Sequence, residues 1–168
     1  AGGQAPAHQK RGERHEQRLD TRPRRGRSSH EVNHMLQMIK GGGGAHLNEK
    51  VVASASDKFI CIADESKYVS RLGKFPLPVE VLPGARSLVS RKLLAMGGQP
   101  ELRVGYTTFY GNQIVDVHGL NIDQALKMED EINKITGVLE NGIFARDAAD
   151  VLVLGTAEGA KVILPCQD

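Results

Sequence analysis

Residues 38–67 read MIKGGGGAHLNEKVVASASDKFICIADESK, and this stretch decides how the chain is expected to fold. The elements it predicts are a strand end over 35–39, a tight loop over 41–44, a helix over 47–56 and a strand over 59–63. The helix is expected to turn Val51 and Val52 inward. A glycine-rich loop between a strand and a helix directs backbone N–H groups toward one point, where an anion can bind.

The chain after Pro78 continues to alternate between strand and helix signals. The predicted elements are strand 79–82, helix 85–96, strand 101–104, strand 113–117, helix 122–135 and strand 138–143. This order is βαββαβ, which is typical of a ferredoxin-like lobe. The apolar face of its first helix is expected to contain Leu88, the stem of Arg91, Leu94 and Ala95. A strand over 151–154 and a turn at Glu158-Gly159 then lead to residues 161–164 as a closing hairpin.

The overall composition is that of a globular protein with an aliphatic core. Of the 168 residues, 40% are hydrophobic and 25% charged, while only 4% are aromatic and none is tryptophan. The two cysteines, Cys61 and Cys166, belong to no CxxC or Cys/His cluster, so neither structural zinc nor a disulfide framework is expected. No apolar run is long enough to cross a bilayer, and no signal peptide is apparent. We therefore expect a cytoplasmic protein without a membrane partner.

Residues 1–30 differ in composition from the rest of the chain. They contain eight lysines and arginines against three acidic residues, so the basic charge of the protein is concentrated in this tail. With almost no aliphatic residues, the tail cannot bury enough surface to offset the entropy of ordering, and we expect it to be disordered. A basic arm can bind nucleic acid, but this one has no aromatic residue for base stacking. Nucleic acid is therefore an unlikely partner.

The segment 40–50 combines a cation, a flexible loop and a carboxylate, in the order Lys40, Gly41 to Gly44 and Glu49. It is not a Walker P-loop, because Gly-Lys-Ser/Thr is missing, and it does not clearly meet the dinucleotide fingerprint GxGxxG. Taken alone, such a segment is also typical of an ordinary loop. Lys67 follows the next predicted strand, where α/β sheets tend to place binding groups, and is either a phosphate ligand or a solvated lysine.

Three longer stretches resemble ribose-5-phosphate isomerase type A over residues 31–164. They are the opening stretch from MIKGGGG to DESK, LGKFPLPVEVLPGARSLVSRKL at 72–93 and GNQIVDVHG at 111–119. The resemblance implies that Lys40, Gly41, Gly42 and Gly43 contact the sugar. It implies that Glu49 is the catalytic carboxylate that moves the proton, and that Lys67 also binds substrate.

The implied reaction interconverts ribose 5-phosphate and ribulose 5-phosphate through an enediolate, a step of the pentose phosphate pathway. One carboxylate in a partly desolvated pocket suffices to accept a proton from one carbon and return it to its neighbour. Lys40 and glycine N–H groups would stabilise the enediolate oxygens, and Lys67 would hold a substrate oxygen or the phosphate. Neither a metal nor another cofactor is required.

Two departures from the family pattern concern residues of its pocket. The family motif Asp-Gly-Ala-Asp-Glu aligns with residues 27–31, where Arg27 and His30 replace the two aspartates. These replacements cannot inherit the roles in ring opening and hydroxyl binding that the resemblance assigns to the aspartates. Downstream, Thr-Asp-Asn-Gly-Asn becomes Thr108-Phe109-Tyr110-Gly111-Asn112, which we expect to alter a turn more than the chemistry.

The resemblance also implies a domain organisation for this α/β chain. Residues 1–30 are expected to be a non-native tail, arising from another reading frame or a misplaced start, with a purposeful disordered arm as the alternative. Residues 31–77 and 144–168 are expected to be the remnant of a catalytic domain with a partial Rossmann-like parallel sheet, and 78–143 the ferredoxin-like lobe. The first strands and phosphate loop of the family are missing, so impaired activity is expected.

The family usually forms homodimers or homotetramers, and the same is expected here. A competing interpretation is a non-catalytic sugar-phosphate-binding or assembly module that retains the isomerase scaffold.

Overall fold

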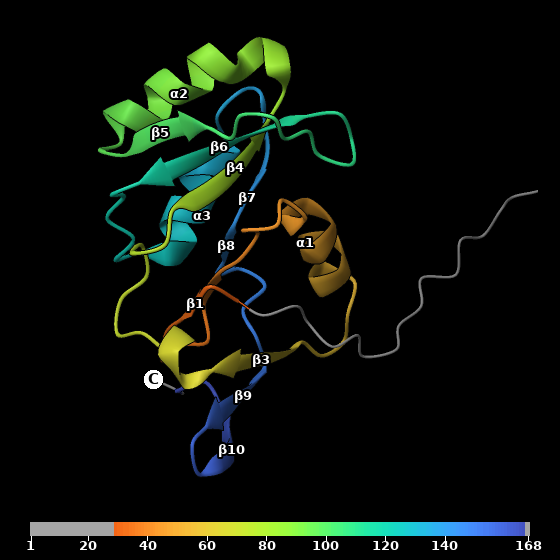
Figure 1. Ribbon diagram of the computed structural model, residues 1–168, viewed down its shortest axis with the longest axis vertical. Helices are drawn as coiled ribbons and strands as arrows, with labels where there is room; N and C mark the ends of the chain where they lie inside the picture. The colour runs from red at the N-terminus through yellow and green to blue at the C-terminus, as the bar shows by residue number, and fades with distance from the viewer. Residues whose placement is uncertain (1–28, 167–168) are drawn as a thin grey trace, which may run out of the picture.

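The computed structural model describes residues 29–166 (Figure 1). The expectations about a disordered basic tail and its origin concern residues 1–28 almost entirely, and these lie outside the described residues. Arg27, the first of the two aligned positions that lack an aspartate, lies outside them as well.

One lobe of the molecule is a four-stranded sheet with two helices, at the top of Figure 1. Its elements are β4 (Leu77–Val81), the 3-10 turn η2 (Pro83–Ala85), α2 (Arg86–Ala95), β5 (Gln99–Leu102), β6 (Gln113–His118), α3 (Ala125–Asn133) and β7 (Val138–Asn141). The strands run antiparallel in the order β5-β6-β4-β7. This is the βαββαβ order of elements that the sequence predicts.

The rest of the described chain forms two small sheets and helix α1. Its elements are β1 (Glu31–Val32), β2 (Met38–Ile39), α1 (His46–Ser54), β3 (Ile60–Asp64), the 3-10 turn η1 (Glu65–Lys67), β8 (Ile143–Phe144), β9 (Val151–Thr156) and β10 (Gly159–Ile163). One sheet has the antiparallel order β1-β2-β8, and the other has the order β10-β9-β3. Within residues 29–166, β3 and β9 are the one pair of named strands that runs parallel. The chain is therefore mixed α/β, and the Rossmann-like description stays a prediction.

The prediction that α1 buries Val51 and Val52 is wrong. These side chains are 53% and 44% exposed, whereas His46 and Lys50 are buried. His46 and Lys50 are four residues apart and therefore share a face of the helix. Polar side chains can occupy this face because neighbouring elements supply hydrogen-bond partners, which hydrophobic periodicity does not reveal.

The predicted apolar face of α2 is also wrong. Val89 and Leu93 are the buried residues of this helix, while Leu88, Arg91, Leu94 and Ala95 are all exposed. Both sets have helical spacing, so the face is misplaced by one position. The charged Arg91 within the predicted face was the signal against it.

Strands β4 and β5 each begin two residues before the predicted start, and each includes a proline. β4 includes Pro78, at which it pairs with β6, but its pairing with β7 begins only at Val79. β5 includes Pro100 and is an edge strand, where a missing N–H is tolerated. The predicted strand 138–143 is divided at Gly142 into β7 and β8.

Two hydrophobic clusters form the core. The larger lies in the four-stranded lobe and includes Leu77, Val79, Leu93, Val117 and Ile132. The smaller includes Val32, Cys61, Phe144 and Leu152 around the two small sheets. In the part of the chain that the structure describes, no helix is long and apolar enough to cross a membrane.

Candidate active site

Lys40 is held in place through its backbone at the end of β2. Its N–H donates to the carbonyl oxygen of Gly142 at 2.9 Å. A Cβ atom on Gly142 would lie 2.4 Å from the carbonyl oxygen of Lys40, so only glycine allows this close approach. The link between β7 and β8 therefore fixes the point at which Lys40 leaves the sheet.

The ammonium group of Lys40 lies in a largely covered position. Its side chain is only 3% exposed, and Nζ lies 5.8 Å from the ring centroids of both Phe59 and Phe144. Nζ is also 3.6 Å from Oε2 of Glu49. The structure thus brings together the two charged groups that the sequence separates by nine residues.

Glu49 presents a carboxylate oxygen that is not hydrogen-bonded. Its Oε2 atom is buried and has no hydrogen-bond partner among the described residues, although the side chain as a whole is 22% exposed. A buried polar atom without a partner is costly and rare in native proteins. Such an atom beside a cation is a candidate for proton transfer or ligand binding.

The glycine loop lies between these two charged groups in the sequence and forms a tight turn. Gly41 and Gly44 have φ of 93° and 78°, in the region that favours glycine, and the N–H of Gly44 donates to the carbonyl of Gly41 at 2.8 Å. A Cβ on Gly41 would lie 2.6 Å from Cβ of His46, whereas a Cβ on Gly43 would meet nothing within 4 Å. The loop is therefore packed at Gly41 and open at Gly43.

Two side chains from the segment between β5 and β6 hold the carbonyl groups of this loop. Arg103 Nη1 donates to the carbonyl of Gly42 at 3.0 Å, and the Tyr106 hydroxyl donates to that of Gly43 at 3.0 Å. Arg103 is itself fixed by Asp116 on β6, to which its Nε donates at 2.8 Å. In a trans peptide the C=O and the following N–H point in opposite directions. Arg103 therefore directs the N–H of Gly43 away from itself.

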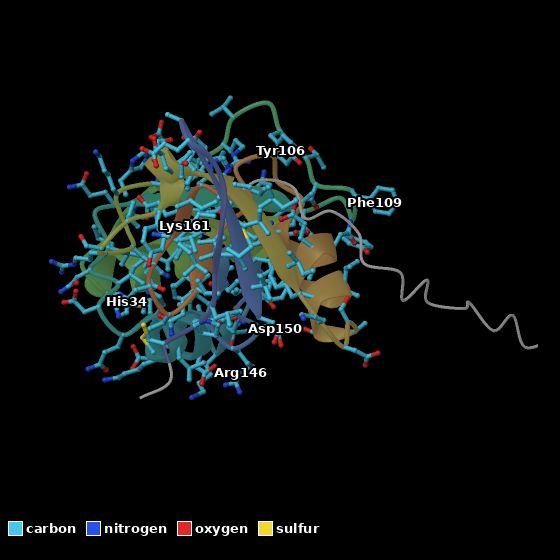
Figure 2. All side chains as sticks on the ribbon, turned by 90° about the horizontal axis from the view of Figure 1, so that it is seen from below. His34, Tyr106, Phe109, Arg146, Asp150 and Lys161 are labelled. Carbon is cyan, nitrogen blue, oxygen red and sulfur yellow. The ribbon has the colours of Figure 1, made fainter. Side chains whose placement is uncertain are left out.

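The two aromatic residues of the 108–112 turn differ in their surroundings. The Tyr110 hydroxyl donates to Asn48 Oδ1 at 2.6 Å, so this turn contacts helix α1. Phe109 is 88% exposed and points away from the body of the protein in Figure 2. Thr108 and Asn112 instead point inward and both donate to the buried carboxylate of Glu80.

Lys67 and His30 approach the same site from other elements. Lys67 ends η1, directly after β3, and is half-buried. The pKa of His30 is lowered from 6.5 mainly by burial and then by the positive charges of Lys67 and Lys40, whereas Glu49 raises it. The charged residues that the sequence singles out therefore act together on one imidazole.

Comparisons with known proteins identify the family of this chain. The family described as ribose 5-phosphate isomerase A (phosphoriboisomerase A) matches residues 28–159. The chain belongs to this family. Ribose-5-phosphate isomerase A of Neisseria meningitidis serogroup B (strain ATCC BAA-335 / MC58) is 91% identical over 137 residues. That alignment covers 82% of this chain but 61% of the relative, so the chain spans about three fifths of the relative's length.

Solved structures of ribose 5-phosphate isomerases agree with this membership. The enzyme from Neisseria gonorrhoeae has a TM-score of 0.82 and 88% identity, with 83% of this chain and 63% of that chain covered. The enzyme from Methanocaldococcus jannaschii has a TM-score of 0.78 and 44% identity, covering 82% and 63%. A third, in complex with phospho-erythronic acid, has a TM-score of 0.78 and 40% identity, covering 82% and 62%.

Sequence reasoning missed four residues that shape the site of this isomerase-family chain. Arg103 and Tyr106 lie about 60 positions from the loop they bind, and no local pattern marks them. His30 stood out only as a departure from the family motif. Glu31, which follows it, is buried and accepts the N–H groups of Gly73 and Phe75, each at 2.7 Å. No local pattern marks Glu31 as buried, because Ser29 and His30 precede it and Asn33 and His34 follow it closely.

Proposed function

We propose that this chain is an aldose-ketose isomerase that interconverts ribose 5-phosphate and ribulose 5-phosphate through an enediolate. The observation that carries the proposal is the buried Glu49 oxygen, which lacks a hydrogen bond among the described residues and lies 3.6 Å from the Lys40 ammonium. Family membership, and the phosphorylated acid bound by one solved relative, support a sugar phosphate as the substrate.

Glu49 is the proton carrier in this proposal. Its carboxylate accepts the proton from C2 of the aldose, which leaves an enediolate, and returns a proton to C1. The ketose results when the C2 hydroxyl proton also passes to the oxygen on C1. The Oε2 atom of Glu49 accepts no hydrogen bond among the described residues, so no donor competes with the substrate proton for this oxygen. Its partial exposure leaves a path for the substrate to reach it.

Lys40 and the loop Gly41, Gly42 and Gly43 stabilise the negative charge that develops on the substrate oxygens. A buried ammonium and fixed backbone donors need no reorganisation during the reaction, and such donors act most strongly where water is excluded. The clamp by Arg103 and Tyr106 supports this role because it fixes the orientation of the loop peptides. Lys67 holds a substrate oxygen or the phosphate as a compact cation.

The proposal includes a division of the chain. Residues 31–77 and 144–168 form a catalytic domain with a Rossmann-like sheet, and 78–143 form a ferredoxin-like lobe. The two hydrophobic clusters and the strand order β5-β6-β4-β7 support this division. We further propose a cytoplasmic homodimer or homotetramer, supported by exposed apolar side chains on β3 and β10 such as Ile62 and Val162. Sedimentation equilibrium of the 168-residue chain tests the oligomeric state.

Turnover by the purified chain tests the function. Ribose 5-phosphate is added to the protein, and ketose formation is followed over time. Glu49→Gln, purified in the same way, controls for isomerase carried over from the expression host. Ketose formation by the parent above this control is the expected result. Binding of ribose 5-phosphate without turnover would contradict it and favour the non-catalytic binding module.

A further inference from the structure

The imidazole of His30 lies directly against the glycine loop. Its Nε2 accepts the N–H of Gly42 at 3.1 Å. A Cβ atom on Gly42 would lie 2.2 Å from the same nitrogen, so the ring covers this glycine closely. Gly43, one residue further, has open space around it.

Two further contacts fix the ring in this position. It stacks on Phe75 with a centroid distance of 4.0 Å and an interplanar angle of 3°, and the backbone N–H of His30 donates to the carbonyl of Ile39 at 2.9 Å. The contact with Gly42 therefore belongs to a packed arrangement in which both the backbone and the ring are held.

The contact requires an unprotonated Nε2, and the surroundings favour that state. Burial lowers the pKa of His30, and the positive charges of Lys67, Lys40 and Arg103 lower it further. The negative charge of Glu49 raises this pKa but is outweighed. Lys67 belongs to η1 and Lys40 directly follows β2. Arg103 directly follows β5, and Glu49 belongs to α1. At neutral pH the neutral imidazole consequently accepts the Gly42 N–H.

We propose that His30 occupies a donor of the glycine loop, so that a sugar phosphate must displace its imidazole before a substrate oxygen can bind the Gly42 N–H. This inference rests on the proposed function, since it concerns the same loop. Gly42 is held at both of its backbone groups, by His30 at the N–H and by Arg103 at the carbonyl, which belong to successive peptide units of the loop. Removing His30 leaves the loop clamped but frees the donor.

The size of the effect follows from the exchange of one neutral hydrogen bond. Such a bond contributes a modest net free energy, which corresponds to about threefold to tenfold in affinity. His30→Ala should therefore bind ribose 5-phosphate about threefold to tenfold more tightly than the parent. Protonation of His30 should also increase the affinity for ribose 5-phosphate, because it breaks the hydrogen bond to Gly42 and adds a positive charge near the loop.

Nuclear magnetic resonance of the 168-residue chain without ligand tests the contact itself. The Gly42 amide proton should shift between pH 7.5 and 4.5 with a midpoint below 6.5. It should lose this titration in His30→Phe, which keeps a ring on Phe75 but has no acceptor. A Gly42 amide with the same titration in parent and variant would overturn the contact.

Calorimetric titration with ribose 5-phosphate at pH 7.5 tests the competition, comparing the parent, His30→Ala and His30→Phe. Tighter binding by His30→Ala supports it, and circular dichroism verifies that both variants fold. If His30→Ala unfolds, the comparison uses His30→Phe, for which equal or weaker binding than the parent overturns the competition. Equal or weaker binding by a folded His30→Ala overturns it likewise while the proposed function stands. No binding by any of the three overturns the proposed function and the competition together.

Discussion

Two faces of helix α1 carry buried charges that are satisfied to very different degrees. Lys50 donates to four oxygen atoms, those of Glu129 at 2.7 Å, Glu140 at 2.9 Å, Asn141 at 3.0 Å and Ile143 at 2.6 Å. The preceding residue, Glu49, has an Oε2 with no hydrogen bond among the described residues and a cation at 3.6 Å. The ammonium group of Lys50 is surrounded by acceptors, whereas Oε2 of Glu49 has no donor among the described residues.

We propose that this difference separates a residue for stability, Lys50, from a residue for chemistry, Glu49, within one short helix. A buried charge with all its partners joins α1 to α3, β7 and β8, and the removal of one member leaves the others uncompensated. A buried carboxylate oxygen without donors costs folding free energy, and such costs are characteristic of functional sites. The same substitution should therefore act mainly on turnover at Lys40 and mainly on folding stability at Lys50.

Lys50→Met should produce the largest effect on folding. It leaves Glu129 and Glu140 without their cation, and breaking a buried pair in this way costs about 3 to 5 kcal/mol. Chemical denaturation measures the loss in the free energy of unfolding. The matched control is Lys127→Met, which removes a surface pair to Glu131 at 3.9 Å and should cost less than about 1 kcal/mol. Equal losses for the two variants would contradict the structural role of Lys50.

Lys40→Met should act mainly on turnover. The loss of one preorganised donor to a developing oxyanion lowers kcat by about 10² to 10³. The loss in the free energy of unfolding should be smaller than that of Lys50→Met. Steady-state kinetics with ribose 5-phosphate and denaturation of the same preparations provide the two readouts. If Lys40→Met unfolds as easily as Lys50→Met but retains full kcat, Lys40 has a structural role and the proposed difference between the two lysines is wrong.

His46 makes the stability of α1 depend on pH. Burial lowers its pKa from 6.5 to about 4, although a hydrogen bond to the Glu140 carbonyl opposes the shift. Between these values the unfolded chain binds a proton that the folded chain does not. His46 should thus contribute fully above pH 6.5 and lose about 3 kcal/mol as the pH falls to about 4.

The free energy of unfolding across this range, compared between parent and His46→Phe, isolates the contribution of His46. The variant cannot titrate at this position and should show the shallower decline toward low pH. Identical declines would contradict a neutral buried His46.

Glu31→Gln should have the smallest of these effects. The amide can accept only one of the two N–H groups, from Gly73 and Phe75, that the carboxylate accepts now. The unpaired donor should cost about 1 to 3 kcal/mol in the free energy of unfolding. Glu65→Gln, at an exposed position, is the control and should change it by less than about 0.5 kcal/mol. A loss no greater than that of the control would show that the paired hydrogen bonds of Glu31 contribute nothing to stability.

The sequence predicted the order of elements better than the buried faces. Alternating strand and turn signals identified βαββαβ, because hydrophobic runs and glycines are local features. The buried face of α1 was missed because its residues, His46 and Lys50, are polar and become buried through partners distant in the chain. The face of α2 was missed because Leu88 and Val89 both start stripes with helical spacing, and the charge of Arg91 in the first stripe was not weighed.

The candidate site shows the same limit. Lys40 and Glu49 were found through a short segment and a family resemblance, and the structure brings their charged groups together. Arg103 and Tyr106 reach the loop only through tertiary packing. The roles of all these residues in catalysis remain predictions, which a direct observation of proton transfer can test.

Exchange of carbon-bound hydrogen in ribose 5-phosphate with deuterium oxide provides that observation. The partly exposed carboxyl of Glu49 should exchange its proton with solvent while the enediolate exists. Mass spectrometry of the sugar after incubation with the parent should show deuterium on carbon, and Glu49→Gln should show none above background. Incorporation by Glu49→Gln at the rate of the parent would contradict the assignment of Glu49 as the base.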